Sequence, residues 1–264
     1  MSDTPTLDAQ VLLAHVLGVS RAWVLAHPEA SLSPEEQLRL EEGMGRLEAG
    51  EPLPYVLGHW EFYGLDFTLT PATLIPRPET ELLVEQALDW LGAHPQRCLV
   101  ADVGAGSGCI AVALAAHHPG LQVIATDISL PALRVAQQNA AKHEILERVW
   151  PVQCDLLPAV SRPLDLICAN LPYIPIETLR SLRLARREPE LALSGGLDGL
   201  ALIRRLLALA PRHLAPGGLL LIEIEATQGE AARLLAQSAF PQASVELLPD
   251  LAGHDRLIRI ETAV

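Results

Sequence analysis

The stretch Leu99-Val100-Ala101-Asp102-Val103-Gly104-Ala105-Gly106-Ser107-Gly108 decides the fold class of this chain. Its first five residues form an apolar run typical of a buried strand, and the apolar residues 109–116 that follow predict a helix. The glycines between strand and helix allow a tight turn and a close approach of the backbone to a ligand. A Gly-x-Gly-x-Gly turn is weakly specific alone, so it favours a nucleotide-type ligand but leaves a purely structural turn as the alternative.

Polar residues end the next two apolar steps of the sequence. Asp127 follows the predicted strand 121–126, about 20 residues after the glycine-rich turn, where a carboxylate can accept both hydroxyls of a ribose. The alternative role for Asp127 is to cap the helix that begins near Pro131. Asp155 and Leu156 follow the next apolar step and can bind an adenine amino group. Together the three positions predict an adenosine site.

The tetrapeptide Asn170-Leu171-Pro172-Tyr173 ends a further apolar strand, residues 164–169. The Asn170 side-chain oxygen and the Leu171 carbonyl can each accept one N–H of a planar NH₂ group, which frees the nitrogen lone pair and stabilises positive charge developing there. Pro172 favours an extended Leu171, and Tyr173 offers a flat wall for an amide. A proline turn with a capping asparagine is the alternative, but the preceding cofactor-type turn favours a catalytic loop.

From residue 79 onward, predicted helices alternate with predicted strands near 98–103, 121–126, 164–169 and 218–224. This alternation is typical of an α/β protein with a doubly wound parallel sheet. The closing segments 244–248 and 256–260 predict a strand pair at one edge of that sheet.

The residues before this unit predict two smaller parts. Residues 1–51 have a helical pattern, with Ser33-Pro34-Glu35-Glu36 as a helix start, and form a small all-helical domain. This part is rich in acidic residues, which indicates either a solvated surface or a docking face for a basic partner. Residues 52–78 carry prolines, glycines and alternating aromatic residues, which predict a β-hairpin linker rather than more helix. Residues 79–264 then form the catalytic domain.

Composition excludes several other classes of protein. With 19 basic and 32 acidic residues, the formal charge of −13 opposes binding to bare DNA. The apolar runs are too short for a membrane span, and Met1–Gln10 lacks a signal-peptide pattern, so we expect a cytoplasmic protein. The four cysteines form no C-x-x-C pair and predict neither a disulfide framework nor a metal site.

Over nearly its whole length the chain resembles the peptide-chain release factor glutamine methyltransferases. The resemblance is carried by the motifs above, by a linker signature that separates the chain from DNA amino-methyltransferases, and by matches in the last third. These further segments are Tyr55–Gly58, Phe62–Gly64, Leu74–Glu81, Glu188-Pro189, Ala192-Leu193, Gly195–Leu200 and Gly253–Arg256. The resemblance implies a Rossmann-like class I methyltransferase sheet with a helical N-terminal substrate-recognition domain and a hairpin linker.

The resemblance also implies the ligands. S-adenosylmethionine, with S-adenosylhomocysteine as product, would be bound by Gly104, Ala105, Gly106, Ser107, Gly108, Asp127, Asp155, Leu156 and Asn170. Asn170, Leu171, Pro172 and Tyr173 would hold the glutamine of the release factor's Gly-Gly-Gln loop, whose methylation tunes translation termination. We expect a monomer that acts on release factors and binds neither DNA nor a membrane.

Two positions depart from the family pattern. Leu171 replaces the usual proline, which predicts a more flexible loop, and Glu225 stands where a glycine commonly precedes x-x-Gln. Arg77 and Glu79 in the linker signature either face the cofactor cleft or form only an interdomain ion pair. The competing functions are a base-directed RNA or DNA amino-methyltransferase, a non-catalytic S-adenosylmethionine-binding scaffold and, last, an NAD-dependent dehydrogenase.

Overall fold

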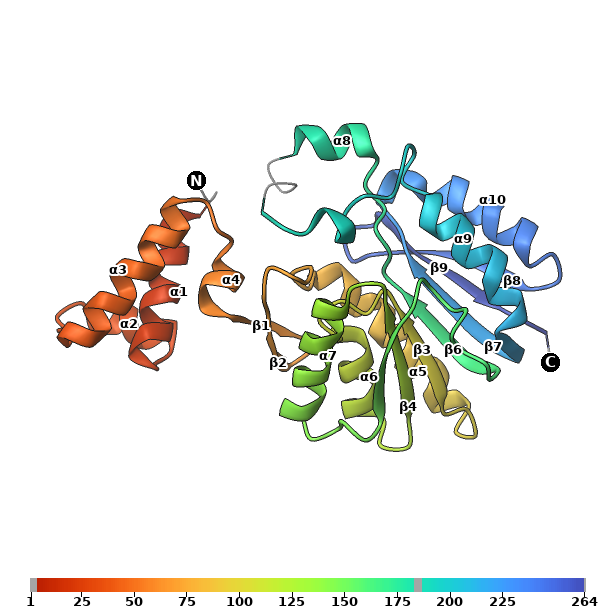
Figure 1. Cartoon of the computed structure of the whole chain (residues 1–264), viewed down its shortest axis with the longest axis horizontal. Helices are drawn as coiled ribbons and strands as arrows, with labels where there is room; N and C mark the ends of the chain where they lie inside the picture. Colours follow the sequence, from red (N-terminus) through yellow and green to blue (C-terminus); the bar gives the residue numbers. More distant parts are fainter. Residues whose placement is uncertain (1–3, 183–186, 264) are drawn as a thin grey trace.

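A computed structural model of the chain describes residues 4–182 and 187–263. It contains a helical N-terminal unit, a short hairpin and an α/β unit, in this order along the chain. Figure 1 shows the helical unit at one end of the molecule, joined to the α/β unit through the hairpin. In the described ranges no helix is long and apolar enough to cross a membrane.

Four helices form the N-terminal unit: α1 Pro5–Leu17, α2 Arg21–Ala26, α3 Pro34–Glu48 and α4 Leu53–Leu57. Helix α3 begins as predicted, because Ser33 and Glu36 form a reciprocal capping box. Leu12, Val16 and Leu53 form the buried centre of the unit. The prediction of no helix in the linker was wrong for Leu53–Leu57, since prolines in the first turn of a helix cost little.

The hairpin consists of β1 His59–Phe62 and β2 Leu65–Thr68, paired antiparallel. Phe62 and Phe67 are almost completely buried in the core of the α/β unit. The hairpin is therefore packed against the α/β unit as a fixed element, and its burial anchors the C-terminal end of the helical unit.

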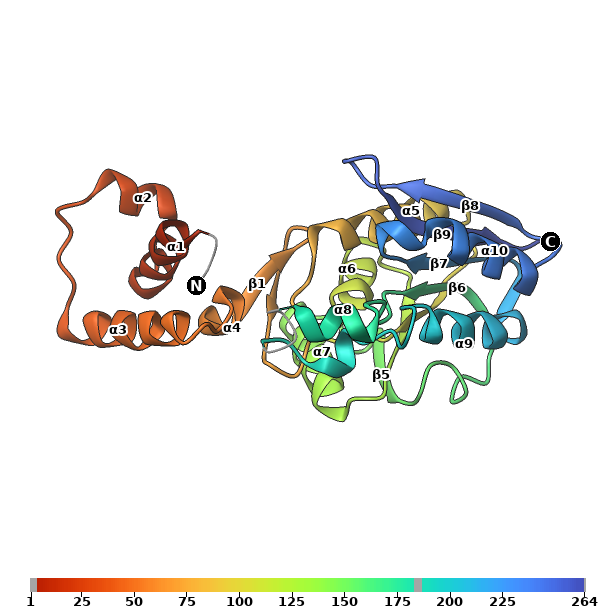
Figure 2. The same ribbon diagram turned by 90° about the horizontal axis from the view of Figure 1, so that it is seen from above.

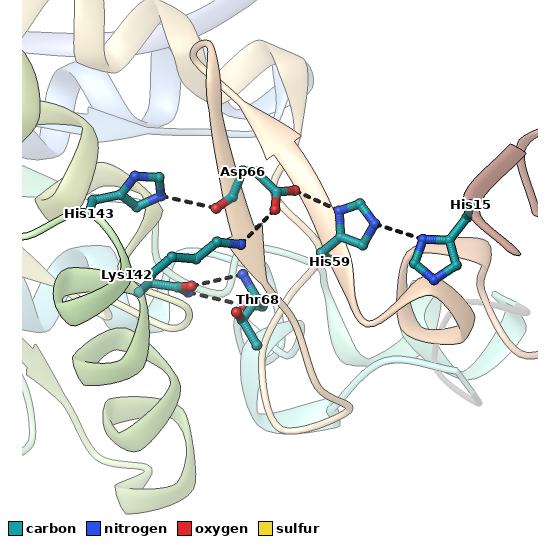
Figure 3. A network of polar contacts seen from close by, with 7 residues as sticks. His15, His59, Asp66, Thr68, Lys142 and His143 are labelled. Carbon is teal, nitrogen blue, oxygen red and sulfur yellow. Dashed lines mark hydrogen bonds and ion pairs between the residues drawn. The ribbon is translucent and has the colours of Figure 1, made fainter. Parts of the chain in front are cut away.

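A chain of polar contacts runs from the helical unit through the hairpin to helix α7, Leu130–Lys142 (Figure 3). His15 Nδ1 lies 3.2 Å from His59 Nε2, and His59 Nδ1 lies 2.6 Å from Asp66 Oδ1. Lys142 donates to Asp66 Oδ2 at 2.6 Å, and His143 Nε2 lies 3.0 Å from the Asp66 carbonyl oxygen. Asp66 thus connects the hairpin to the helical unit through His59 and to helix α7 through Lys142.

The α/β unit is built on one seven-stranded sheet with the order β5-β4-β3-β6-β7-β9-β8. Its strands are β3 Leu99–Val103, β4 Gln122–Asp127, β5 Val149–Gln153, β6 Leu164–Ala169, β7 Leu214–Glu223, β8 Ser244–Pro249 and β9 Asp255–Glu261. Neighbouring strands from β5 to β7 pair parallel, whereas β9 pairs antiparallel with both β7 and β8. The predicted edge pair is confirmed, but the sheet is mixed rather than wholly parallel.

Helices cover both faces of the sheet, as Figures 1 and 2 show. Helices α5 Glu81–Ala93, α6 Cys109–His117 and α7 pack on one face through residues such as Leu83, Val112 and Ala140. Helices α9 Ala201–Leu209 and α10 Gly229–Ala239 pack on the other face through residues such as Leu206 and Ala236. In the described part of the chain the other helical elements are η1 Pro78–Thr80, α8 Ile176–Ser181, η3 Glu190–Ala192, η4 Ala210–Arg212 and η5 Ala226–Gln228. This layering directs the carboxyl ends of β3, β4 and β6 toward one edge, where open α/β sheets bind ligands.

Candidate active site

A cavity of about 420 Å³ opens at the carboxyl ends of the central strands. Its size falls within the range of roughly 300–1,000 Å³ that is typical of small-molecule sites. The predicted site residues that line it are Gly104, Ala105, Gly106, Ser107, Asp127, Asp155, Leu156, Asn170, Leu171 and Pro172. The structure therefore brings together residues that the sequence places on four separate segments, each at or after the end of a strand.

The turn after β3 is held in shape by the end of β4. Gly104 N and Ala105 N donate to the Thr126 carbonyl oxygen at 2.8 and 2.9 Å, and Gly106 N donates to Asp127 Oδ2 at 2.9 Å. Gly108 does not line the cavity; its φ of 78° starts helix α6, and a methyl group there would lie 2.9 Å from Ala136 Cβ. The glycines thus serve the turn and the packing of the helix that follows.

Asp127 lines the cavity and is not the residue that caps helix α7. Ser129 is the residue whose side chain caps that helix, by accepting from Ala132 N. The two Asp127 oxygens accept one backbone N–H each, from Gly106 and from Ser129. Since each carboxylate oxygen has two lone pairs, both oxygens can still accept a ribose hydroxyl.

Asp155 and Leu156 form one wall of the cavity. Asp155, which is predicted to contact an adenine, also pairs with an arginine: its Oδ2 accepts from Arg205 Nη2 at 2.7 Å. Leu156 is buried and has a φ of 65°, a conformation that costs a non-glycine residue about 1 kcal/mol or more and is concentrated at functional sites. Arg205, which the sequence did not indicate, also lines the cavity.

Asn170–Tyr173, the predicted catalytic loop, packs directly on the glycine-rich turn. Leu171 is 2% exposed, and a methyl group at Gly104 would lie 3.0 Å from Leu171 Cδ2. Burial of this side chain anchors the loop, which differs from the expectation that leucine in place of proline makes it more flexible. Asn170 Nδ2 donates to Thr80 Oγ1 at 3.0 Å.

A second, smaller cavity of about 60 Å³ adjoins the first. Tyr173 lines only this cavity, whereas Asn170, Leu171 and Pro172 line both. The Tyr173 hydroxyl donates to Glu223 Oε1 at 3.3 Å, and burial raises the pKa of this phenol. The tetrapeptide therefore stands at the boundary between a large and a small site.

Backbone contacts support the catalytic loop from behind. Gln228 Nε2 donates to the Tyr173 carbonyl oxygen at 2.8 Å, and any side chain at Gly199 would collide with that same carbonyl. Glu225, the second departure from the family pattern, has a φ of −75° and forms a capping box with Gln228. No glycine is needed at that position, because the backbone adopts an ordinary conformation.

Arg77 joins the linker to the segment after the catalytic loop. Its Nη2 donates to Glu188 Oε1 at 2.5 Å, and Glu188 Oε2 accepts from Ile75 N at 3.0 Å. The Glu188 side chain is fully buried, and Arg77 lines both cavities. Arg77 thus both forms an ion pair and faces the cleft, whereas Glu79 is exposed and lines neither cavity.

Two carboxyl groups beneath the site have raised pKa values. Burial raises the pKa of Asp102 to about 7, and its Oδ1 has no hydrogen-bond partner in the described part of the chain. Burial likewise raises the pKa of Glu223 to about 7, although Thr80, Arg256 and Tyr173 act in the opposite direction.

The sequence did not single out Thr80, Glu223 or Gln228 individually. Glu223 carried one usable signal, because a glutamate that ends an apolar strand beside the catalytic strand is unusual in a core. Thr80 and Gln228 act through contacts with residues distant in the chain, and no local pattern predicts such contacts.

Comparison with known proteins agrees with this arrangement. Residues 1–58 match the family model described as the PrmC N-terminal domain, and residues 79–181 match the methyltransferase small domain. The release factor glutamine methyltransferase of Moorella thermoacetica is 45% identical over 256 residues, covering 96% of this chain and 90% of the relative. The corresponding protein of Cereibacter sphaeroides is 43% identical over 258 residues, covering 97% and 91%.

Solved structures share the fold. The ribosomal protein L11 methylase from Lactobacillus delbrueckii subsp. bulgaricus superposes with a TM-score of 0.53 and 24% identity, covering 74% of this chain and 84% of that chain. At this identity the likeness concerns the fold alone. The identity to the two full-length relatives, which extends over both units and the linker, shows that the chain belongs to the release factor glutamine methyltransferase family.

Proposed function

We propose that this protein transfers a methyl group from S-adenosylmethionine to the side-chain amide nitrogen of the glutamine in the Gly-Gly-Gln loop of a peptide-chain release factor, and so tunes translation termination. The observation that carries the proposal is the meeting of two cavities at Asn170, Leu171 and Pro172. The larger cavity has the size of a nucleoside site, and the smaller one has room for a side-chain amide.

The residues of the larger cavity fit S-adenosylmethionine. Asp127 retains free lone pairs for the ribose hydroxyls, and Gly104 and Gly106, which lack side chains, present their backbone to the cavity. Asp155, Leu156 and Arg205 also line this cavity, and an adenine can lie beside them. When bound, S-adenosylmethionine supplies an electrophilic methyl group on a sulfonium.

The chain's own residues then act on the incoming amide. An amide nitrogen is a poor nucleophile because its lone pair is delocalised, so positioning matters more than a base. With Asn170 Nδ2 donating to Thr80, the Asn170 Oδ1 is left to accept one N–H of the substrate. The Leu171 carbonyl accepts the second N–H, and both acceptors stabilise the positive charge that develops on nitrogen. Tyr173 lines the pocket on which the planar amide rests.

The helical unit is the part proposed to recognise the protein substrate. Its acidic residues suit a basic partner surface, and the overall charge of −13 disfavours bare nucleic acid. We propose a cytoplasmic monomer that acts on release factors and not on DNA.

The proposal is tested by incubating the enzyme with methyl-labelled S-adenosylmethionine and a purified release factor, followed by peptide mass analysis. The matched control is the same release factor with its Gly-Gly-Gln glutamine changed to alanine, and nucleic acid alone is a second control. Label on the wild-type loop peptide alone supports the function. Label on the control release factor or on nucleic acid refutes the assignment of the substrate.

A further inference from the structure

The Asn170 side chain can serve as an acceptor for the substrate only if its amide group is turned the right way. The oxygen and nitrogen of a carboxamide have nearly the same size, so packing alone does not fix which of them faces the cavity. If Nδ2 faced the substrate, two N–H donors would meet and no acceptor would remain. Some group behind Asn170 must therefore determine the orientation.

That group is the Thr80 hydroxyl, which is 2% exposed. Thr80 Oγ1 accepts from Asn170 Nδ2 at 3.0 Å. A hydroxyl has only one proton, so Thr80 accepts from Asn170 only while its own proton points elsewhere. The Thr80 proton therefore needs an acceptor other than Asn170.

Glu223 supplies the acceptor for that proton. It ends strand β7 beside the end of β6, where Ile222 is the register partner of Ala169, so it lies directly behind the catalytic loop. Its side chain is 1% exposed, and the Thr80 hydroxyl is close enough to lower the pKa of the carboxyl group. Glu223 Oε1 accepts from the Tyr173 hydroxyl, whereas Oε2 is buried and has no hydrogen-bond partner in the described ranges, so it is free to accept a proton from Thr80.

We propose that Thr80 and Glu223 are positioning residues for methyl transfer: the Glu223 carboxylate accepts the hydroxyl protons of Thr80 and Tyr173, and this fixes the Asn170 amide with Oδ1 toward the substrate. The inference rests on the proposed function of the catalytic loop. It gives one buried carboxylate control over both ends of that loop, since Asn170 begins it and Tyr173 ends it.

The ionisation of Glu223 then sets the direction of the relay. A carboxylate can only accept, whereas a protonated Glu223 can donate to Thr80 and so allow Thr80 to donate to Asn170, which reverses the amide. The groups that face Glu223 are Thr80, Tyr173, Arg256 and Glu79. With a pKa of about 7, the active orientation is populated as pH rises through neutrality.

The test compares Thr80→Val, Thr80→Ser and Glu223→Gln with wild-type enzyme in single-turnover methylation of a release factor, with the affinity for S-adenosylmethionine measured separately by calorimetry. Thr178→Val, on the exposed face of α8, is the matched control. We expect the single-turnover rate constant of Thr80→Val to fall roughly 10- to 100-fold, the loss typical of a misplaced catalytic group. Cofactor affinity should stay within about threefold, and Thr80→Ser should recover most of the rate.

Glu223→Gln adds a second readout, because glutamine can donate to Thr80 at every pH. Its rate should be low and independent of pH between about 6 and 8, whereas the wild-type rate rises over that range. Three results would each overturn the inference. They are a wild-type rate of transfer by Thr80→Val, equal losses of rate in Thr80→Val and Thr80→Ser, and a pH profile of Glu223→Gln that is the same as that of the wild type. Failure of the wild-type enzyme to methylate any release factor would instead refute the proposed function, so the two failures are distinguishable.

Discussion

Replacing Asn139 with alanine should destabilise the junction between the hairpin and the glycine-rich turn. Asn139 lies on α7 and is completely buried. Its Oδ1 accepts from Thr68 N at 2.8 Å, and its Nδ2 donates to the carbonyl oxygens of Thr68 at 3.0 Å and Ser107 at 2.9 Å. One side chain thus forms hydrogen bonds with the backbone of β2 and with that of the glycine-rich turn.

The cost follows from the groups left without partners. Each buried backbone group that loses its hydrogen bond costs about 1–3 kcal/mol, and the Ser107 bond is the most deeply buried of the three. The two Thr68 bonds are partly buried, so water reduces their cost toward the lower end of that range. We therefore expect Asn139→Ala to lower the free energy of unfolding by roughly 3–5 kcal/mol.

The assay is urea unfolding followed by circular dichroism, with the affinity for S-adenosylmethionine measured on the folded variant. Gln138→Ala is the control, because Gln138 is exposed on the same helix and should change stability by less than about 0.5 kcal/mol. Affinity should fall for Asn139→Ala and not for the control, since Ser107 lines the cavity. A loss of stability below about 1 kcal/mol would refute the reasoning.

Three further changes have defined outcomes. Gly199→Ala should lower the melting temperature and kcat together, because the added methyl group collides with the Tyr173 carbonyl oxygen; a variant with wild-type kcat would contradict this. Ser33→Ala should cost about 1 kcal/mol through loss of the α3 cap, visible as faster amide exchange in that helix. The pKa of His15 is lowered by burial and then by His59, so the folded protein binds fewer protons than the unfolded chain below pH 6.5. Stability should therefore fall as pH drops below 6.5, and His15→Gln should lessen that fall in urea titrations at pH 7.5 and 5.5.

The sequence predicts the parts of the fold that depend on local pattern. The strands at 99–103, 122–127 and 164–169 are mainly apolar segments next to turn residues, and the structure has them within a residue of the predicted bounds. Strand β5 was predicted only as an apolar step before Asp155, without bounds, because Pro151 and an exposed Trp150 interrupt its apolar pattern. Proline is compatible with this strand because β5 lies at the edge of the sheet.

The site likewise has residues that local sequence pattern predicts and residues that it does not. Asp127 and Asn170 end apolar strands, so their position at the sheet edge follows from the sequence alone. The supporting residues do not follow from it, because Thr80 lies 90 residues from its partner Asn170. Such pairs depend on how the linker packs across the sheet, and the antiparallel direction of β9 likewise depends on the tertiary arrangement.

The most direct test of the catalytic role of the Asn170–Tyr173 loop is single-turnover methyl transfer by Asn170→Ala, with the affinity for S-adenosylmethionine measured in parallel. The account predicts a loss in rate of roughly 100-fold or more, because an acceptor that acts mainly in the transition state is removed. Cofactor affinity should remain within roughly tenfold of wild type, since most of the larger cavity is intact. A wild-type rate of transfer to the loop glutamine by Asn170→Ala would contradict the account.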